Sequence, residues 1–281
     1  MNRFLLKSLT ISAICLSLNA NALMINWTDW TTSNSTNGFT AIGSITSGLE
    51  VIDVTYNNPQ GVGFIQTGSG TDYFQNGRSG RDPATSPYTS EGPNGVDNIP
   101  PAAEMIALQF AGTQTLSFSQ PIANPYFAYV SLNQNGYGFD QDFELLSNTG
   151  SNLDGSSNGP DDFGYWGCGT SEKVLPSPGV YELNQAQQSC GTEPHGVLRF
   201  TGIFSQVSWV SLSNEFWNGF TVGIQGTDDQ VFPCQVNPSL PECQSDDPND
   251  NPNNEIPEPS TITLLALAAI CGRRVMMLRK K

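Results

Sequence analysis

The residues of this chain that could carry out acid–base chemistry are a single histidine and a scattered set of carboxylates. His195 stands in the stretch EPHGVLRF, two residues after Glu193. Hydrolysis by a serine, a histidine and an acid needs a histidine that the acid orients beside an activated serine. The sequence has many serines and does not single one out as the partner of His195. We therefore interpret His195 as a turn or surface residue, and we expect the protein not to be an enzyme.

Glycoside hydrolysis is the other chemistry that the acidic residues could support, because it needs two carboxylates roughly 5–10 Å apart. Asp142 and Glu144 would lie on the same face of one strand, since they are two residues apart. Further candidates are Asp140, Asp161 and Asp162. The chain has 26 acidic residues, so such pairs also arise by chance. A glycoside hydrolase is therefore the second alternative function.

Two stretches, NQNGYGFDQD and DGSSNGPDD, are rich in side-chain oxygens and in glycine. Calcium takes six to eight oxygen ligands from carboxylates, amides and carbonyls. Neither stretch has the spacing of an EF-hand loop. We expect no cofactor, and a structural calcium at Asp140 and Asp142, or at Asp161 and Asp162, is the alternative that the sequence leaves open.

Aromatic side chains suggest a further alternative, the binding of carbohydrate. Tyrosine and tryptophan rings stack on the apolar faces of sugar rings when loops expose them. Tyr165 and Trp166 lie in a glycine-rich loop and are the predicted sugar contacts. Trp209 alternates with Val207 and is predicted to lie in a core, whereas 216–218 reads as a structural corner before a strand. A carbohydrate-binding module is the first alternative function.

Short strands must position all of these residues. Runs such as LEVIDVTYN, PYFAYVSL and QVSWVSLS alternate apolar and polar residues and are bounded by Gly, Pro or Asn. No window of a dozen residues keeps a helical period. The sequence therefore predicts an all-β fold of roughly ten to twelve strands over residues 23–227, arranged as a two-sheet, jelly-roll-like sandwich. Residues 75–102 and 148–169 are predicted to be long loops.

Charge limits the classes of partner. Residues 23–256 hold four basic and 25 acidic residues, a net charge of about −21. A body of this charge repels nucleic acid and anionic lipid surfaces. We therefore expect no nucleic-acid partner.

Four cysteines, Cys168, Cys190, Cys234 and Cys243, lie between the two hydrophobic ends of the chain. An even number of cysteines is typical of proteins in an oxidising compartment. Four cysteines allow three connectivities. We favour the nearest-neighbour pairing, in which Cys168 bonds Cys190 and Cys234 bonds Cys243.

The N-terminal residues 1–22 have the layout of a secretory signal peptide. Arg3 and Lys7 precede a short apolar run, and Ala20-Asn21-Ala22 supplies small residues for signal peptidase. The apolar run is too short for a membrane span. We expect cleavage after Ala22 and export of the remaining chain.

The C-terminal end is a second targeting segment. Residues 228–255 form an acidic, Asn- and Pro-rich linker, and 256–281 begin with Pro257-Glu258-Pro259-Ser260. The uncharged stretch 261–272 would be about 18 Å long as a helix, shorter than the roughly 30 Å hydrocarbon core. Extension to about residue 278 lets it span the membrane, with the basic cluster facing the cytoplasm. That cluster is Arg273, Arg274, Arg279, Lys280 and Lys281.

This tail resembles a PEP-CTERM sorting signal of Gram-negative bacteria that make exopolysaccharide. The resemblance covers about the last 26 residues, and the stretches LSFSQPIANPYFAYVSL and GVLRFTGIFSQVSWVSLSNEFWNGFTVGIQ also look like a β-sandwich region of PEP-CTERM proteins. It implies that exosortase processes an inner-membrane precursor facing the periplasm and releases the ectodomain to the cell surface or exopolysaccharide matrix of a biofilm. It carries over no catalytic residue. A structural or adhesive protein is thus the expected function.

Overall fold

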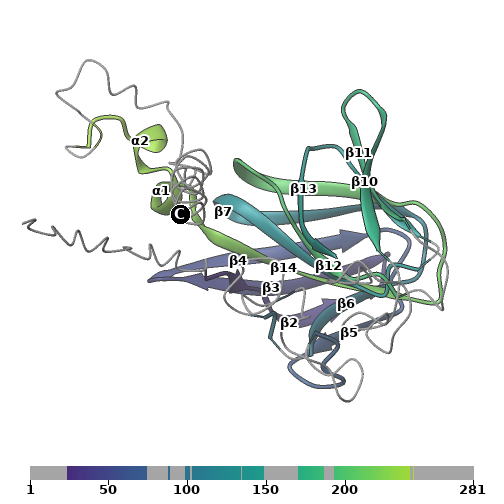
Figure 1. Cartoon of the computed structure of the whole chain (residues 1–281). Coiled ribbons are helices and arrows are strands. Elements are labelled where there is room, and N and C mark those ends of the chain that lie inside the picture. The colour runs from purple at the N-terminus through teal and green to yellow at the C-terminus, as the bar shows by residue number, and fades with distance from the viewer. Residues whose placement is uncertain are drawn as a thin grey trace, which may run out of the picture. The chain divides into compact units, whose positions relative to one another are not determined.

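The computed structural model describes residues 24–74, 88, 99–101, 103–133, 135–148, 170–186, 193–240 and 243 (Figure 1). The chain divides into one compact unit that ends at Asp228 and a second that begins at Asp229. Within the described residues the first unit holds fourteen strands in one antiparallel, hydrogen-bonded network. The predicted all-β fold is confirmed.

The strand pairing divides into two sets that share the long strand β7 (Gly112–Val130). In hydrogen-bonded order, the first strand set is β2 (Asp29–Asn34), β3 (Phe39–Ser47), β4 (Glu50–Asn58), β7, β13 (Ile203–Ser211), β8 (Gly136–Phe139), β11 (Val180–Gln185) and β10 (Ser171–Ser177). The second strand set is β9 (Glu144–Asn148), β12 (Gly196–Arg199), β7, β14 (Asn218–Thr227), β6 (Glu104–Leu108) and β5 (Phe64–Thr67), with β1 (Asn26–Trp27) also paired to β14.

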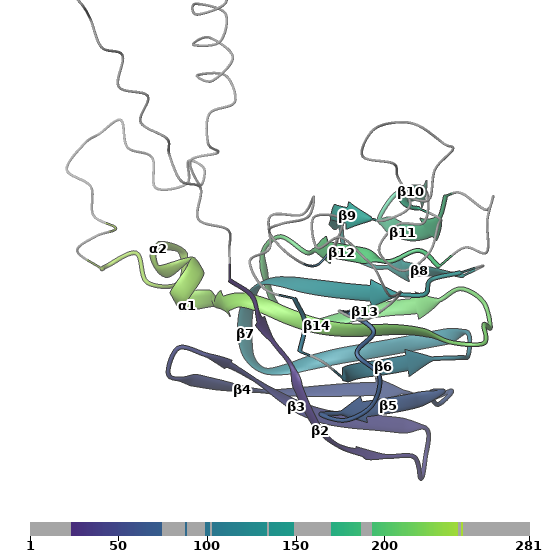
Figure 2. The same cartoon turned by 60° about the horizontal axis from the view of Figure 1, so that its bottom comes forward.

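Strand β7 belongs to both sets because its two halves have different neighbours. Residues 112–118 pair with β4 and β13, and residues 122–123 pair with β13 and β14. Residues 125–130 pair with β14, and within them 126–129 also pair with β12. Pro121, which has no amide hydrogen to donate, lies between the halves, and the register with β13 shifts there. Figure 2 shows that β7, in teal, is strongly curved. The curve brings the two sets over one another in a sandwich-like arrangement.

Side chains from both strand sets meet in one hydrophobic core. Phe127 of β7 stacks on Phe220 of β14 with ring centroids 4.9 Å apart, and Trp209 of β13 approaches both rings edge-on at 5.4 and 5.2 Å. All three side chains are almost completely buried. The prediction that Trp209 is a core residue is confirmed.

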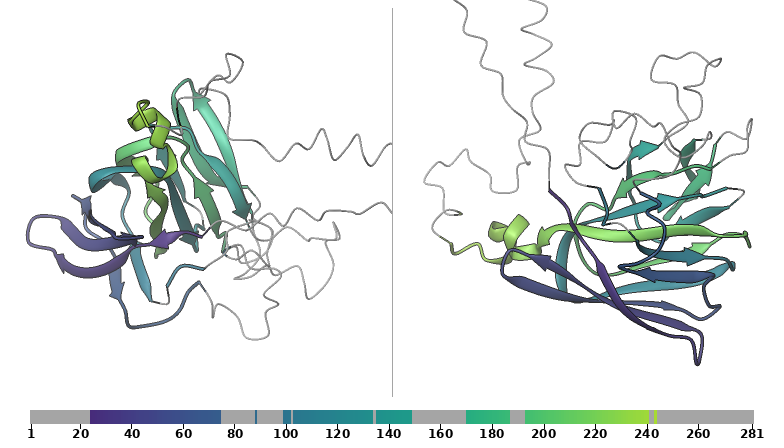
Figure 3. Two further views of the ribbon diagram at one scale, coloured as in Figure 1. Left: turned by 90° about the vertical axis from the view of Figure 1, so that its left-hand side faces the viewer. Right: turned by 90° about the horizontal axis from the view of Figure 1, so that it is seen from below.

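A second hydrophobic cluster covers the other face of the second strand set. Tyr126, Ala128 and Val130 alternate with the core residues of β7 and pack in this cluster with Phe74 and others. Strand β14, green in the right-hand view of Figure 3, is likewise buried along almost its whole length. Burial on both faces explains why the second half of β7 is apolar at nearly every position and does not show the predicted alternation of apolar and polar residues.

Asn124, in the second half of β7, has a left-handed backbone conformation with φ of 47°. Its Oδ1 accepts a hydrogen bond from the Gly202 N–H at 2.9 Å, and its Nδ2 donates to Gln225 Oε1 at 2.8 Å. Asparagine tolerates this conformation better than most residues. The side chain therefore ties β14 and the turn before β13 to an irregular point of β7.

We expect Asn124→Ala to lower the free energy of unfolding by about 2–3 kcal/mol, because it leaves partly buried partners unpaired and keeps the unfavourable φ. Asn124→Gly loses the same hydrogen bonds but adopts positive φ freely, so it should cost about 1 kcal/mol less than alanine. Urea unfolding of the two variants separates the loss of the hydrogen bonds from the cost of the positive φ. Equal losses for alanine and glycine would contradict the backbone part of the explanation.

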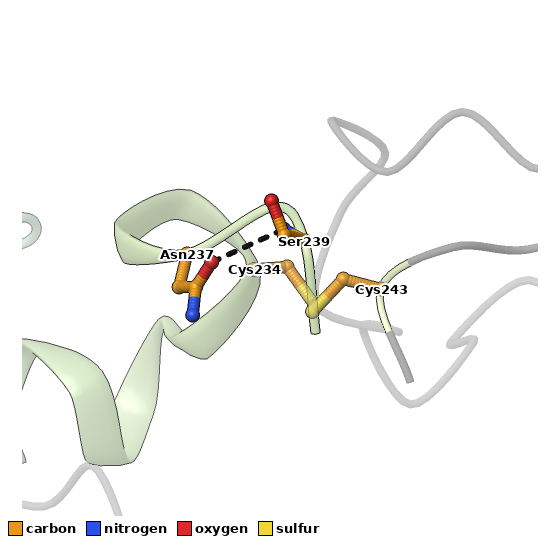
Figure 4. The surroundings of a disulfide bond; sticks show 4 residues. All are labelled: Cys234, Asn237, Ser239 and Cys243. Atoms are coloured by element: carbon orange, nitrogen blue, oxygen red, sulfur yellow. Dashed lines mark hydrogen bonds between the residues drawn. A yellow bond between two sulfur atoms is a disulfide. The ribbon is translucent and has the colours of Figure 1, made fainter. Parts of the chain in front are cut away.

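The second unit contains two single-turn helices and a disulfide. Helix α1 (Asp228–Val231) begins at the unit boundary, α2 (Pro233–Val236) follows, and Cys234 is bonded to Cys243. Figure 4 shows the bond and the adjacent turn, in which Asn237 Oδ1 accepts a hydrogen bond from the Ser239 N–H at 3.2 Å. The predicted pairing of these two cysteines is confirmed. Among the described residues, no helix is both long and apolar enough to cross a membrane.

Candidate functional site

The two carboxylates predicted to share one strand face, Asp142 and Glu144, form separate ion pairs. Asp142 contacts the ammonium group of Lys173 on β10, and Glu144 Oε2 lies 2.5 Å from a guanidinium nitrogen of Arg199 on β12. Both carboxylate side chains are more than half exposed. Because each carboxylate already has its own cation, this geometry favours structural roles for the two acids over an acid–base pair.

Lys173 fixes the base of the β10–β11 hairpin, which projects beyond its neighbouring strands (Figure 1). Its Nζ donates a hydrogen bond to the carbonyl oxygen of Phe143 at 2.7 Å. The same nitrogen lies 5.2 Å from the ring centroid of Phe143 and 5.4 Å from that of Tyr181, within the range of cation–π attraction. Asp142 therefore acts as one of several partners of this lysine.

The calcium alternative receives no support from the described residues. Asp140 is exposed after β8, and Asp142 is paired with Lys173. No group of three or more His, Cys, Asp or Glu side chains suited to a metal ion occurs in the part of the chain that the structure describes. The remaining predicted site residues lie outside that part: Asp161, Asp162, Tyr165, Trp166, Cys168, Cys190, the sorting motif 257–260 and the basic cluster within 273–281.

His195 stands in the turn before β12, as predicted, but it is fully buried and not a surface residue. Its Nδ1 lies 2.8 Å from the carbonyl oxygen of Glu193, and its ring packs against Tyr88 at 6.0 Å between centroids. Tyr88 comes from the long predicted loop, and its hydroxyl donates a hydrogen bond to the carbonyl oxygen of Tyr129 at 2.6 Å. Sequence reasoning missed the burial because the covering residue is more than a hundred positions away.

Three loops of the β body meet in a polar corner, which we define by Asn133, Glu193, Glu215 and Asn218. Glu215 accepts hydrogen bonds from the backbone N–H of Asn133 at 3.2 Å and from the Asn218 amide at 2.8 Å. The side-chain amide of Asn133 donates to Glu193 Oε1 at 3.0 Å. Asn133 is thus hydrogen-bonded to both carboxyl groups.

Burial raises the pKa of Glu215 from its ordinary value of 4.5 to about 8, and the charge of Glu193 adds to the increase. The hydrogen bonds from Asn218 and Asn133 act in the opposite direction. At neutral pH Glu215 therefore holds a proton. A protonated carboxyl beside a second carboxyl group is a familiar acid–base arrangement. Here Asn133 contacts both groups, which favours a polar joint between loops over a catalytic pair.

An aromatic edge, which we define by Phe64, Tyr73 and Trp217, adjoins the polar corner along the chain. The ring of Trp217 lies 4.9 Å from that of Tyr73 and 5.7 Å from that of Phe64, centroid to centroid. These three rings are only partly buried, and Phe216 is 85% exposed. The stretch 216–218 is therefore a corner, as predicted, in which Asn218 is buried while Phe216 is displayed to solvent.

The loop that carries Phe216 and Trp217 is held by hydrogen bonds that backbone N–H groups donate. The N–H of Glu215 donates to the Gln109 carbonyl at 3.1 Å, and the N–H of Ala111 donates to Asn214 Oδ1 at 2.8 Å. The N–H of Ser213 donates to Asn135 Oδ1 at 2.9 Å. Phe216 is thus presented on an anchored loop. The consecutive aromatic pair before a strand was the available sequence signal, but the partners Phe64 and Tyr73 could not be assigned from spacing.

Comparisons with family models, with curated proteins and with solved structures found no match for this chain.

Proposed function

We propose that this chain is an exported structural or adhesive protein of the cell surface or exopolysaccharide matrix. The observation that carries the proposal is the Cys234–Cys243 disulfide, which lies between the β body and the C-terminal tail. Disulfides persist in oxidising compartments and are rare in the cytosol. Export through the signal peptide 1–22 would carry Cys234 and Cys243 into an oxidising compartment, where this disulfide can form and persist.

The β body is proposed to be a jelly-roll-like sandwich of two sheets. The sharing of β7 between the strand sets and the core between them support this arrangement. A compact, acidic sandwich with hydroxyl- and amide-rich strands suits a protein that stays soluble outside the cell.

The C-terminal segment is proposed to sort the protein. The apolar helix at about 261–278 would hold the precursor in the inner membrane, facing the periplasm, and exosortase would process it at Pro257-Glu258-Pro259-Ser260. The prolines support this, because each keeps the preceding residue extended and accessible to an enzyme. Replacing Pro257 and Pro259 with alanine in a host that has exosortase should leave the full-length precursor in the membrane fraction. Release of the variant at the wild-type rate would contradict the sorting step.

A thiol-reactivity experiment tests export. In protein recovered from the periplasm or cell surface, Cys234 and Cys243 should resist maleimide completely until a reductant is added. In Cys234→Ser, Cys243 should react without reduction. A variant that lacks residues 2–22 is the control, and its two cysteines should react because the cytosol keeps thiols reduced. Equal protection with and without the leader, or a leader that stays uncut in the cytosolic fraction, would overturn the proposal.

Carbohydrate binding is the second candidate function, and a specific observation favours it. Phe216 is displayed to solvent and precedes the partly buried Trp217 in the chain. Single exposed apolar residues are common on soluble proteins. An aromatic ring held on an anchored loop stays exposed to water, which is unfavourable, and a ligand that covers the ring would remove that cost. The predicted sugar contacts Tyr165 and Trp166 remain part of this candidate.

A further inference from the structure

We propose that the polar corner, Asn133, Glu193, Glu215 and Asn218, is a pH-sensitive switch that joins three loops at low pH and opens as the pH rises. The closed switch holds together the segment between β7 and β8, the turn before β12 and the loop between β13 and β14. The inference goes beyond export and carbohydrate binding, since it concerns a movement within the β body.

Glu215 joins the segment before β8 to the start of β14. Its carboxyl group accepts hydrogen bonds from the backbone N–H of Asn133 at 3.2 Å and from the side-chain amide of Asn218 at 2.8 Å. Asn218 is fully buried, and its Oδ1 accepts a hydrogen bond from the hydroxyl of Tyr137 on β8. The state of the Glu215 carboxyl group is therefore transmitted to the core through one buried amide.

Glu193 joins the same segment to the turn before β12. Its Oε1 accepts a hydrogen bond from the side-chain amide of Asn133 at 3.0 Å, and its Oε2 accepts one from the hydroxyl of Ser131. Leu132, between these two residues, donates its backbone N–H to the carbonyl oxygen of Pro194 at 2.9 Å. Three consecutive residues are thus bonded to the turn, and the last of them is bonded to both carboxyl groups.

The segment that both carboxyl groups hold has a strained backbone. Ser131 lies in the left-handed region with φ of 61°, and its side chain is 5% exposed. A residue other than glycine keeps such a conformation only where its surroundings hold it there. Because Glu193 binds the Ser131 hydroxyl, opening of the corner lets this backbone relax. The strain therefore favours opening here before the rest of the β body unfolds.

The proton on Glu215 sets the pH at which the switch opens. Burial, and to a smaller extent the charge of Glu193, raises the pKa of Glu215 from 4.5 to about 8 in the closed state. In the open state, water surrounds the carboxyl group and its pKa returns toward 4.5. The closed state is therefore favoured most below pH 4.5, loses this advantage as the pH rises to about 8, and changes no further above pH 8.

The other titratable groups of the described residues around Glu215 do not produce this dependence. Burial and the charge of Glu215 raise the pKa of Tyr137 well above its ordinary value, so Tyr137 stays neutral. His195 is fully buried beside the Glu193 carbonyl. An imidazole that is neutral when buried takes up a proton on opening below about pH 6.5, which favours opening at low pH instead. Residues 109–111, which accept the Glu215 N–H, have no titratable side chain.

Hydrogen exchange followed by mass spectrometry tests the switch in the full-length chain, with detergent present and the disulfide intact. The exchange of residues 131–136 and 212–218 between pH 5 and 8.5 is divided by the rate of an unstructured peptide, which removes the intrinsic effect of pH. In the wild type, opening should increase about tenfold or more up to pH 8 and then level off. Glu215→Gln stays neutral and keeps a hydrogen-bond acceptor, so the increase should disappear. Glu104→Gln is the matched control and should keep it.

A second variant tests the role of the neighbouring charge. Glu193→Gln removes that charge, so its opening should level off at a lower pH than in the wild type. A plateau that stays at pH 8 in this variant would contradict the part assigned to Glu193. Peptides from β3 report unfolding of the whole β body and should stay more protected than both loops at every pH.

Four results would overturn the switch. They are constant opening of the wild type over this range, opening that increases below pH 6.5, an equal increase in β3, and an increase that Glu215→Gln keeps. The first three come from the wild type alone, so the test does not depend on the folding of a variant. None of them bears on the export proposal, which thiol protection decides separately.

Discussion

Replacement of Phe127 by alanine should lower the free energy of unfolding by about 3–5 kcal/mol, the largest stability loss that we expect from a single substitution. Phe127 lies in the second half of β7 and is 1% exposed. It stacks on Phe220 and meets Tyr137, Phe139 and Trp209 edge-on, at centroid distances of 4.9 to 5.9 Å. Alanine would remove all four ring contacts and leave a cavity where the two strand sets meet.

Chemical denaturation measures this loss, with the disulfide left intact. Phe216→Ala is the matched control, because the same substitution at a side chain that is 85% exposed should change stability by less than about 0.5 kcal/mol. A domain is typically stable by only 5–15 kcal/mol, so Phe127→Ala should also express poorly. If Phe127→Ala lowered the free energy of unfolding by less than about 1 kcal/mol, the ring of Phe127 would not be a main contact between the two strand sets.

The second large effect is a dependence of stability on pH that arises at Glu104. This side chain is buried in β6, and its Oε2 accepts a hydrogen bond from the backbone N–H of Trp30 at 2.8 Å. Burial raises the pKa of Glu104 from its ordinary value of 4.5 to about 7, and the charge of Asp29 adds to the increase, although backbone hydrogen bonds oppose it. The folded protein therefore binds this proton more tightly than the unfolded chain does.

The direction of the effect follows from that difference. Below pH 4.5 both states are protonated, and the stabilisation is fully present. Between pH 4.5 and about 7 the unfolded chain releases the proton first, so stability falls as pH rises, by about 2–3 kcal/mol in total for Glu104. Above pH 7 both states are ionised and this contribution is constant. Glu215, whose pKa rises from 4.5 to about 8 in the folded protein, adds a second decline over the same range and extends it to about pH 8.

Urea unfolding between pH 4 and 9 measures this dependence for the wild type, Glu104→Gln and Glu215→Gln. The difference between wild type and Glu104→Gln should change by about 2 kcal/mol between pH 4.5 and 7 and should then level off. Glu215→Gln should make the decline between pH 4.5 and 7 about half as steep and should remove the part between pH 7 and about 8. Parallel curves for wild type and Glu104→Gln would show that the buried carboxyl is ionised in the folded protein and would contradict its raised pKa.

Local patterns were sufficient for part of the architecture. QVSWVSLS alternates residue by residue, and the structure buries Val207 and Trp209 on one face of β13 as the period of two requires. EMIAL, the sequence of β6, was not identified as a strand, because five consecutive buried residues have no alternation to distinguish a strand from a helix turn. The predicted strand count of ten to twelve was accordingly lower than the fourteen described strands.

The sequence by itself determined the all-β class and favoured the Cys234–Cys243 pair among three connectivities, because strand periodicity and a short loop between cysteines are local properties. It also predicts the leader and the sorting tail, which lie outside the described residues. Only the tertiary structure decided that β7 pairs with both strand sets and that Phe64, Tyr73 and Trp217 meet. It also decided that Glu104 and His195 are buried and that Glu215 is partly buried. These outcomes depend on which distant strands and loops lie side by side. Burial, pKa and ring contacts are properties of those neighbours, and no spacing along the chain encodes them.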